Sequence, residues 1–326
     1  MTRNWMLPDG VEEWLPPSSW ALEDLRRKLL DLYRDRGYGL IYTPLFEHLD
    51  TLLVGAGSDL ESLTFKLVDP ASGRLLGLRA DMTPQAARIV ARRFDQSDVV
   101  RLCYIGTVLR TQPDAMGGSR APRQLGCELF GDASMNADHE ILRLLAETLK
   151  ITGVDTAHLD LGHVGIYRSL VARLGLGADD EATLFDILQR KSQPDYQAFS
   201  SAVGMQPEPA RLIAALMSLN GDLAVIGQAR LALADAGDEA MQALSVLESA
   251  AVELARSAPQ LPLHIDLAEL RGYRYQTGLV FAAFVPGHGR ELARGGRYDG
   301  AGAEFGQGRP ATGFSADLNE LLRLGA

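Results

Sequence analysis

Apolar residues recur at helical spacing near the start of the chain. Between Trp20 and Arg36 they fall at every third or fourth position, and this pattern stops at Gly37. A short run of β-type composition, 38–46, follows. Two further runs of this kind, 64–68 and 74–78, flank the residues Asp-Pro-Ala-Ser-Gly. Because these five residues favour tight turns, the two runs are predicted to pair as a β-hairpin.

Helices and strands of ordinary length are predicted in the next part of the chain. Residues 84–94 and 139–151 have helical spacing, and Pro84 stands in the first turn of the earlier helix, where proline is favoured. The runs 99–109 and 124–130 are predicted to be strands. A polar, glycine-containing loop separates these two strands.

The middle of the chain has a different pattern. From about residue 165 to residue 258 it is rich in alanine and leucine at helical spacing. Strands return at 263–267 and 279–284, and a glycine-rich loop and a last helix, 316–324, follow. Because strands bracket a helical block rather than alternate with helices, the pattern predicts an α+β fold with a helical insertion.

Composition is that of a soluble globular protein with a substantial core, since 46% of the 326 residues are hydrophobic and 23% are charged. No apolar run approaches the roughly 20 residues that span a bilayer, and the N-terminus lacks the apolar segment of a secretory signal. Cys103 and Cys127 have no metal-ligand spacing, so we interpret them as core thiols of a cytoplasmic protein. The net charge of −10 disfavours nucleic-acid binding but does not exclude a local basic patch.

Three segments carry candidate chemistry. In the first, Asp81 and Thr83 stand where a strand ends and a helix begins, so both could simply cap that helix. In the second, Gln124 and Glu128 are four apart on a predicted strand and should face one pocket. A buried carboxylate needs a partner to stay charged, and a bound cation or an imidazole N–H would supply one.

The third segment consists of two glycine-rich stretches that carry arginine, LRGYRYQTG at 270–278 and GGRYDG at 295–300. Such stretches can bind phosphate, but glycines also build tight turns. The residues alone leave both interpretations open.

Taken together, the order and spacing of these segments resemble the catalytic domain of histidyl-tRNA synthetase, a class II aminoacyl-tRNA synthetase. Class II motif 1 is matched by IYTPLFE, and the proline of that motif, here Pro44, lies at the dimer interface in the family. Motif 2 is matched by residues 106–131, and motif 3 is matched by ATGFSADLNEL. The resemblance covers nearly all of residues 1–326. It implies an antiparallel sheet flanked by helices, a helical insertion at about 165–258, and a dimer.

The resemblance also implies a histidine site. Its residues would be Asp81, Thr83, Arg110, Gln124, Glu128, Arg271 and Tyr275. Asp81 and Thr83 would face the α-amino group together with Gln124. Glu128 would accept a hydrogen bond from the imidazole, and Arg271 would hold the carboxylate.

One position of this site departs from the synthetase pattern. Gln276 stands where the synthetase has a tyrosine beside the imidazole, and the neighbouring Tyr275 could compensate.

The residues for ATP chemistry depart further. Arg110 matches the motif 2 arginine that binds the α-phosphate, but Gln112 replaces a glutamate and Glu320 replaces the arginine that grips the γ-phosphate. Replacing an arginine by a carboxylate reverses the sign of the local interaction, so ATP should not bind productively. The sequence ends at Ala326, directly after motif 3, so we expect no anticodon-binding domain and no tRNA partner.

A histidine site without nucleotide chemistry resembles the regulatory subunits of short-form ATP phosphoribosyltransferases. That resemblance implies a chain with no catalytic residue, metal or cofactor. It would pair with the short catalytic subunit in a hetero-octamer, enabling the first step of histidine biosynthesis and its feedback inhibition by histidine. Two alternatives are an active class II ligase and a free-standing histidine sensor with another partner.

Overall fold

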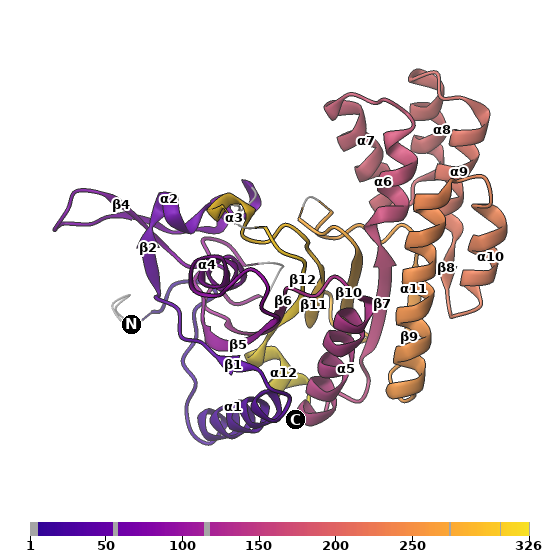
Figure 1. Ribbon diagram of the computed structural model, residues 1–326. Helices are drawn as coiled ribbons and strands as arrows, with labels where there is room; N and C mark the ends of the chain where they lie inside the picture. The colour runs from indigo at the N-terminus through magenta and orange to yellow at the C-terminus, as the bar shows by residue number, and fades with distance from the viewer. Residues whose placement is uncertain (1–5, 55–57, 114–117, 274, 307, 326) are drawn as a thin grey trace.

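A large mixed sheet forms the centre of the molecule in the computed structural model, which describes residues 6–54, 58–113, 118–273, 275–306 and 308–325 (Figure 1). Its strand order is β1-β5-β6-β12-β11-β10-β7-β9-β8. In that order the strands are β1 Gly39–Leu40, β5 Val100–Thr107, β6 Arg123–Phe130, β12 Ala311–Asp317, β11 Ala293–Arg297, β10 Leu279–Phe284, β7 His158–His163, β9 Leu263–Asp266 and β8 Asn220–Gly221. A second sheet, in the order β2-β4-β3, consists of β2 Phe46–His48, β4 Leu75–Leu78 and β3 Lys66–Val68.

Helices flank the large sheet. They are α1 Ser18–Asp35, α2 Leu49–Leu52, α3 Ser58–Leu63, α4 Thr83–Arg93, α5 Met135–Thr152, α6 Val164–Ala172, α7 Ala178–Gln189, α8 Gln193–Ala202, α9 Pro207–Ser218, α10 Val225–Ala232, α11 Asp238–Ser257, the 3₁₀ turn η2 Ala303–Phe305, and α12 Leu318–Leu324. Only β1 with β5 and β7 with β9 pair in parallel among the described strands. The predicted α+β fold with an antiparallel sheet is therefore confirmed, with these two parallel pairs added.

The two faces of the large sheet bury different partners. On the back face, α5 packs on β6 and β12, and α11 packs on β7 and β9. Cys103 and Cys127 are buried in this core, as predicted. On the front face, α4 packs on β6, and its Met82 end joins a smaller core with Tyr104 and Tyr298. The front face thus leaves room for polar side chains over β6, β12 and β11.

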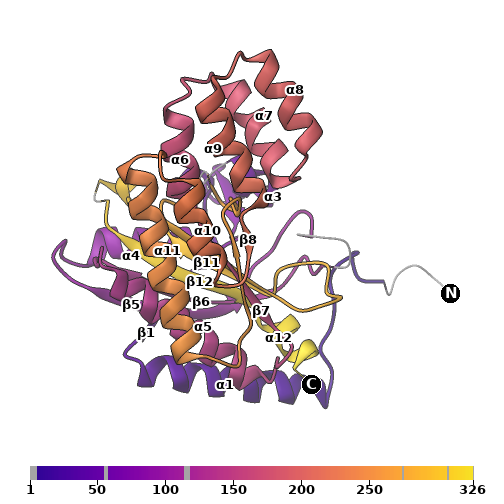
Figure 2. The ribbon, with the colours of Figure 1, turned by 90° about the vertical axis from the view of Figure 1, so that its right-hand side faces the viewer.

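The helical block was predicted closely. It runs from Val164 to Ser257 as α6–α11, interrupted only by the short β8. In both views it stands at one end of the sheet, with α7, α8 and α9 farthest from α1 (Figures 1 and 2). The prediction succeeded because alanine and leucine at helical spacing are a local property of the chain.

Four strands were missed, one of them β8 within the helical block. β7 was not predicted, β11 lies in the segment interpreted as a loop, and β12 overlaps the start of the predicted last helix, which begins at Leu318 rather than at residue 316. The glycines of β11 lower its strand propensity, but pairing with β10 and β12 on both sides overrides that preference. The predicted run 38–46 was also partly wrong, because only its two ends are strands.

No helix in the described part of the chain is long and apolar enough to cross a bilayer.

Candidate functional site

Glycines lie beneath a cluster of polar side chains on the front face, the candidate histidine pocket. A Cβ atom at Gly313 on β12 would overlap the carboxylate of Glu128, and one at Gly126 on β6 would overlap the ring of Tyr104. These glycines therefore let two large polar side chains lie flat on the sheet. Their role is steric, which the sequence could not show.

Asp81 and Gln124 meet at one side of the pocket. The Gln124 Nε2 donates to Asp81 Oδ1 at 2.8 Å, and its Oε1 accepts from the backbone N–H of Met82 at 2.9 Å. Burial works against ionisation of Asp81. However, the pKa of Asp81 is held below its usual value, because favourable interactions outweigh the effect of burial. These are hydrogen bonds from the Gln124 amide and the Thr83 N–H, and the positive charges of Arg294 and Arg110. Asp81 is thus kept as an anion.

The capping interpretation holds for Asp81 and not for Thr83. Asp81 Oδ1 accepts from the Thr83 N–H at 2.8 Å, at the first turn of α4. The Thr83 hydroxyl instead lies 2.9 Å from the Tyr104 hydroxyl and donates to Glu128 Oε1 at 3.2 Å. Asp81 can therefore begin the helix and still present charge to the pocket.

Glu128 is surrounded by hydroxyl groups. Tyr104 donates to its Oε1 at 2.8 Å, and Tyr298 donates to its Oε2 at 2.5 Å. Burial, together with the nearby charge of Asp81, raises its pKa to about 8 against the opposing effect of these hydrogen bonds. Gln124 and Glu128 face the same side of β6, as predicted, and both are buried. Within the described structure, hydroxyl groups supply the hydrogen-bond partners of this carboxyl group.

Tyr275 closes the pocket through the loop 270–278. Its ring stacks on Tyr298 with centroids 4.9 Å apart. The loop is tied to β11 because the Thr277 N–H donates to the Arg297 carbonyl at 2.7 Å. Next to Tyr275, the Oε1 atom of Gln276 is buried with no hydrogen-bond partner among the described residues. Arg274 of this loop lies outside the described residues.

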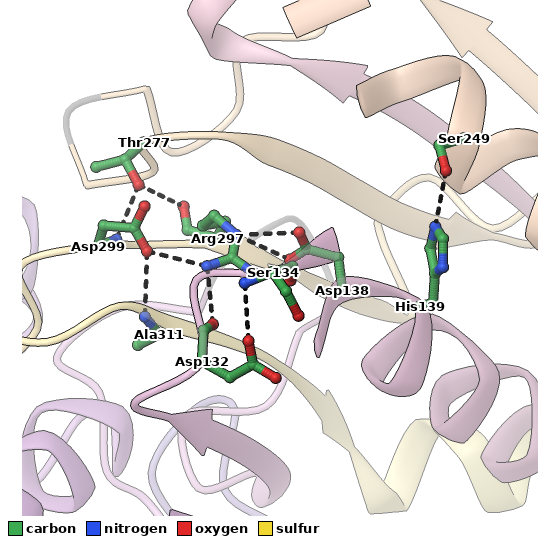
Figure 3. Close-up of polar contacts among 9 residues, drawn as sticks. All are labelled: Asp132, Ser134, Asp138, His139, Ser249, Thr277, Arg297, Asp299 and Ala311. Carbon is green, nitrogen blue, oxygen red and sulfur yellow. Dashed lines mark hydrogen bonds and ion pairs between the residues drawn. The ribbon is translucent and has the colours of Figure 1, made fainter. Parts of the chain in front are cut away.

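Arg297 anchors this arrangement from the back face (Figure 3). Its Nε contacts both carboxylate oxygens of Asp138 on α5 at 3.1 and 3.0 Å, and its Nη1 donates to Asp299 at 3.2 Å. In the GGRYDG segment, Arg297 therefore forms a buried ion pair, and the side chain of Tyr298 lies in the pocket. Neither the phosphate nor the turn interpretation anticipated this; side-chain alternation shows only that the two neighbouring residues point to opposite faces.

Arg271 lies apart from Glu128. Its Nη2 pairs with Glu269 at 2.7 Å, and Asp160 and Glu291 lie at 3.8 and 3.7 Å from the guanidinium. The guanidinium also stacks 4.5 Å from the ring centroid of Phe284. Glu128 and Arg271 therefore do not pair with each other in this structure.

A cleft adjoins the pocket at Gln124. Its charged lining residues are Arg110, Arg290, Arg294, Glu291, Asp317 and Glu320. Arg110 donates from Nε to the Ala80 carbonyl at 3.2 Å.

Glu320 is neutralised inside this cleft. It pairs with Arg290 at 2.8 Å and with Arg323, and His288 lies 3.7 Å away. Burial opposes ionisation of Glu320, but these arginines hold its pKa below the usual value. Gln112 is exposed, in a loop whose residues 114–117 lie outside the described structure. The position of the synthetase's phosphate-binding arginine thus holds a fixed internal anion.

Two residues important to the pocket, Tyr104 and Tyr298, were not identified from the sequence. Both act through strand register, since Tyr104 is paired with Gly126 across β5 and β6. Among the described residues no cluster of His, Cys, Asp or Glu could hold a metal ion.

Comparison with known proteins gives a consistent result. The profile of the histidyl-tRNA synthetase family matches residues 10–321. The ATP phosphoribosyltransferase regulatory subunit of Thioalkalivibrio sulfidiphilus is 54% identical over 323 residues, covering 99% of this chain and 82% of that protein.

Solved structures agree. One is described as an ATP phosphoribosyltransferase regulatory subunit/histidyl-tRNA synthetase, from Bacillus halodurans; it has a TM-score of 0.87 and 28% identity, covering 99% of this chain and 84% of the other. The ATP phosphoribosyl transferase (HisG:HisZ) complex of Thermotoga maritima contains a chain of similar fold, with a TM-score of 0.71 and 18% identity. The match covers 94% of this chain and 98% of that chain. The chain therefore belongs to the ATP phosphoribosyltransferase regulatory subunits, within the histidyl-tRNA synthetase family.

Proposed function

We propose that this regulatory subunit binds free histidine in the front-face pocket and transmits its presence to a short-form ATP phosphoribosyltransferase catalytic subunit. The proposal depends mainly on one observation: Asp81, Gln124 and Glu128 converge on a glycine floor with an anion at one end and a hydroxyl-lined carboxyl group at the other. An ammonium group suits Asp81, and an imidazole N–H suits Glu128.

The remaining residues of the proposed site follow the resemblance. Thr83 and Gln124 would assist Asp81, Tyr275 would cover the imidazole, and Arg271 and Arg110 would supply positive charge for the carboxylate. No cofactor is proposed, because Glu320, which pairs with Arg290 of the adjoining cleft and with Arg323, stands where the resemblance places a phosphate-binding arginine. The relatives' designation as regulatory subunits supports a role without catalysis of its own.

We also propose self-association as a dimer through the motif 1 region. Around Pro44 the chain exposes large apolar side chains, including Tyr42, 75% exposed, and Phe46, 57% exposed. The β3–β4 hairpin beside them exposes Val68 and Leu75. Apolar side chains gathered at sheet edges are usually covered in the functional state. Sedimentation at micromolar concentration that finds only monomer would contradict this part.

We propose that the chain acts in the cytoplasm without tRNA or membrane partners, as one synthetase-like domain with α6–α11 as its insertion. Coupling to the catalytic subunit would be allosteric, with a coupling free energy of typically 1–3 kcal/mol in such systems. The similar fold in the solved complex supports that partner.

The test combines two measurements on the intact chain. Titration calorimetry with histidine should show binding, and addition of the chain to the short catalytic subunit should raise phosphoribosyl transfer and make it sensitive to histidine. Unchanged turnover and unchanged histidine sensitivity would overturn the assignment of the partner. Absence of histidine binding would overturn the assignment of the pocket.

A further inference from the structure

Glu291 lies between two arginines that come from different segments. Its Oε1 pairs with Nη1 of Arg294 on β11 at 2.8 Å, and its Oε2 lies 3.7 Å from Nη1 of Arg271 in the loop 270–278. That Nη1 atom of Arg271 is buried and has no hydrogen-bond partner among the described residues. One carboxylate is thus held firmly by one arginine and only loosely by the other.

The same two segments border the proposed histidine pocket. Strand pairing places Arg294 opposite Ser315 and Ser315 opposite Gly126, which lies between Gln124 and Glu128 on the front face. Neighbouring strands are about 4.8 Å apart, so the Arg294 backbone is roughly 10 Å from that row. An arginine side chain and a small amino acid together can span this separation.

Two further observations place Arg294 on the pocket side. Arg294, Glu291 and Gln124 line one cleft, and Gln124 is hydrogen-bonded to Asp81. The positive charge of Arg294 also helps to keep Asp81 ionised. The positive side of the pocket therefore includes Arg294, which the resemblance did not assign.

We propose that Arg294 and Arg271 form a clamp for the carboxylate of an α-amino acid ligand, and that Glu291 occupies this clamp when no ligand is present. The inference rests on the proposed function and assigns two further residues to that site. On binding, the ligand carboxylate displaces Glu291, whose side chain is 25% exposed and can become hydrated. Glu291 is then an internal competitor that weakens binding of any amino acid with a free carboxylate.

The experiment compares histidine with histidinol, in which a hydroxymethyl group replaces the carboxylate. Titration calorimetry is run on the intact wild-type chain and on Arg294→Ala and Glu291→Gln. We expect Arg294→Ala to weaken histidine binding about tenfold or more and to leave histidinol binding nearly unchanged. We expect Glu291→Gln to tighten histidine binding, by about threefold to tenfold, again without effect on histidinol.

Arg256→Ala is the matched control, because Arg256 on α11 is also an exposed arginine paired with a carboxylate, that of Glu253 at 2.8 Å. It should change neither affinity, and thermal unfolding verifies that each variant is folded. Equal losses for both ligands in Arg294→Ala, no loss at all, or weaker histidine binding in Glu291→Gln would overturn the clamp while the pocket stands. If the wild-type chain binds neither ligand, the proposed pocket itself fails.

Discussion

The pocket around Glu128 and the cleft around Glu320 lie side by side but satisfy their buried charges in different ways. In the pocket, the carboxyl group of Glu128 is surrounded by hydroxyl donors that can be re-paired with a ligand. In the cleft, Glu320 is fixed between Arg290 and Arg323, so arginines and carboxylates of the chain already balance one another. The pocket thus keeps a carboxyl group whose hydrogen-bond partners can be exchanged, whereas Glu320 in the cleft is held in ion pairs within the chain.

The largest effect expected from this comparison is on histidine affinity. Glu128→Ala removes the group proposed to accept the imidazole N–H, and losing a polar partner in a buried site costs about 2–5 kcal/mol, well over tenfold. Glu320→Gln should leave histidine affinity within about threefold, since Glu320 contacts only the cleft arginines and His288 in the described structure. Titration calorimetry with histidine on both variants tests this prediction. Similar losses of histidine affinity in the two variants would show that the pocket and the cleft do not differ in their role in binding.

The next effect is on stability, and the two carboxyl groups should have opposite pH dependence. The pKa of Glu128 is raised from 4.5 to about 8 in the folded chain. Between those values the folded chain keeps a proton that the unfolded chain has lost, so the free energy of unfolding falls as the pH rises from about 4.5 to 8.

Glu128→Gln should remove that loss, on the order of 5 kcal/mol. The pKa of Glu320 is lowered, so its stabilisation is present at neutral pH and is lost on acidification below its ordinary pKa. Glu320→Gln should therefore change only the acid limb. Chemical denaturation from pH 2.5 to pH 8.5 measures both limbs, and a flat wild-type profile between pH 5 and 8 would contradict the assignment for Glu128.

A smaller effect concerns polyanions. Glu320→Gln removes the internal anion and leaves the positive charge of Arg290 and Arg323 less compensated, so tripolyphosphate should bind about threefold to tenfold more tightly at low ionic strength. Glu248→Gln is the matched control, because Glu248 pairs with Arg230 on the surface of the helical block. Equal gains in both variants would show only a general charge effect.

No effect at all is expected on adenylation. Histidine-dependent exchange of pyrophosphate into ATP should stay at background in the wild-type chain and in Glu320→Gln, since Gln112 also departs from the synthetase pattern. Exchange above background that Arg110→Ala abolishes would sink this prediction.

The sequence allowed one half of the pocket to be predicted and not the other. Gln124 and Glu128 share a face because side chains alternate along one strand, which is a local rule. Their partners come from elsewhere in the chain, since Tyr104 lies on β5 and Tyr298 directly follows β11. The glycines beneath Tyr104 and Glu128 take their places through strand register. Likewise, Arg297 looked like a residue for phosphate or a turn because nothing in its own segment revealed Asp138 on α5.

The strand order also has a consequence for how the protein is made. β6 pairs with β12, and Tyr298 stands 170 positions after Glu128 in the chain. At a synthesis rate of about 5–20 residues per second, roughly 10 to 30 seconds separate the two residues on the ribosome. During that time one edge of β6 lacks its final neighbour while the whole helical block is translated. The nascent chain therefore has an unpaired strand edge until β12 is made, and Glu128 can acquire its Tyr298 partner only after residue 298 is translated.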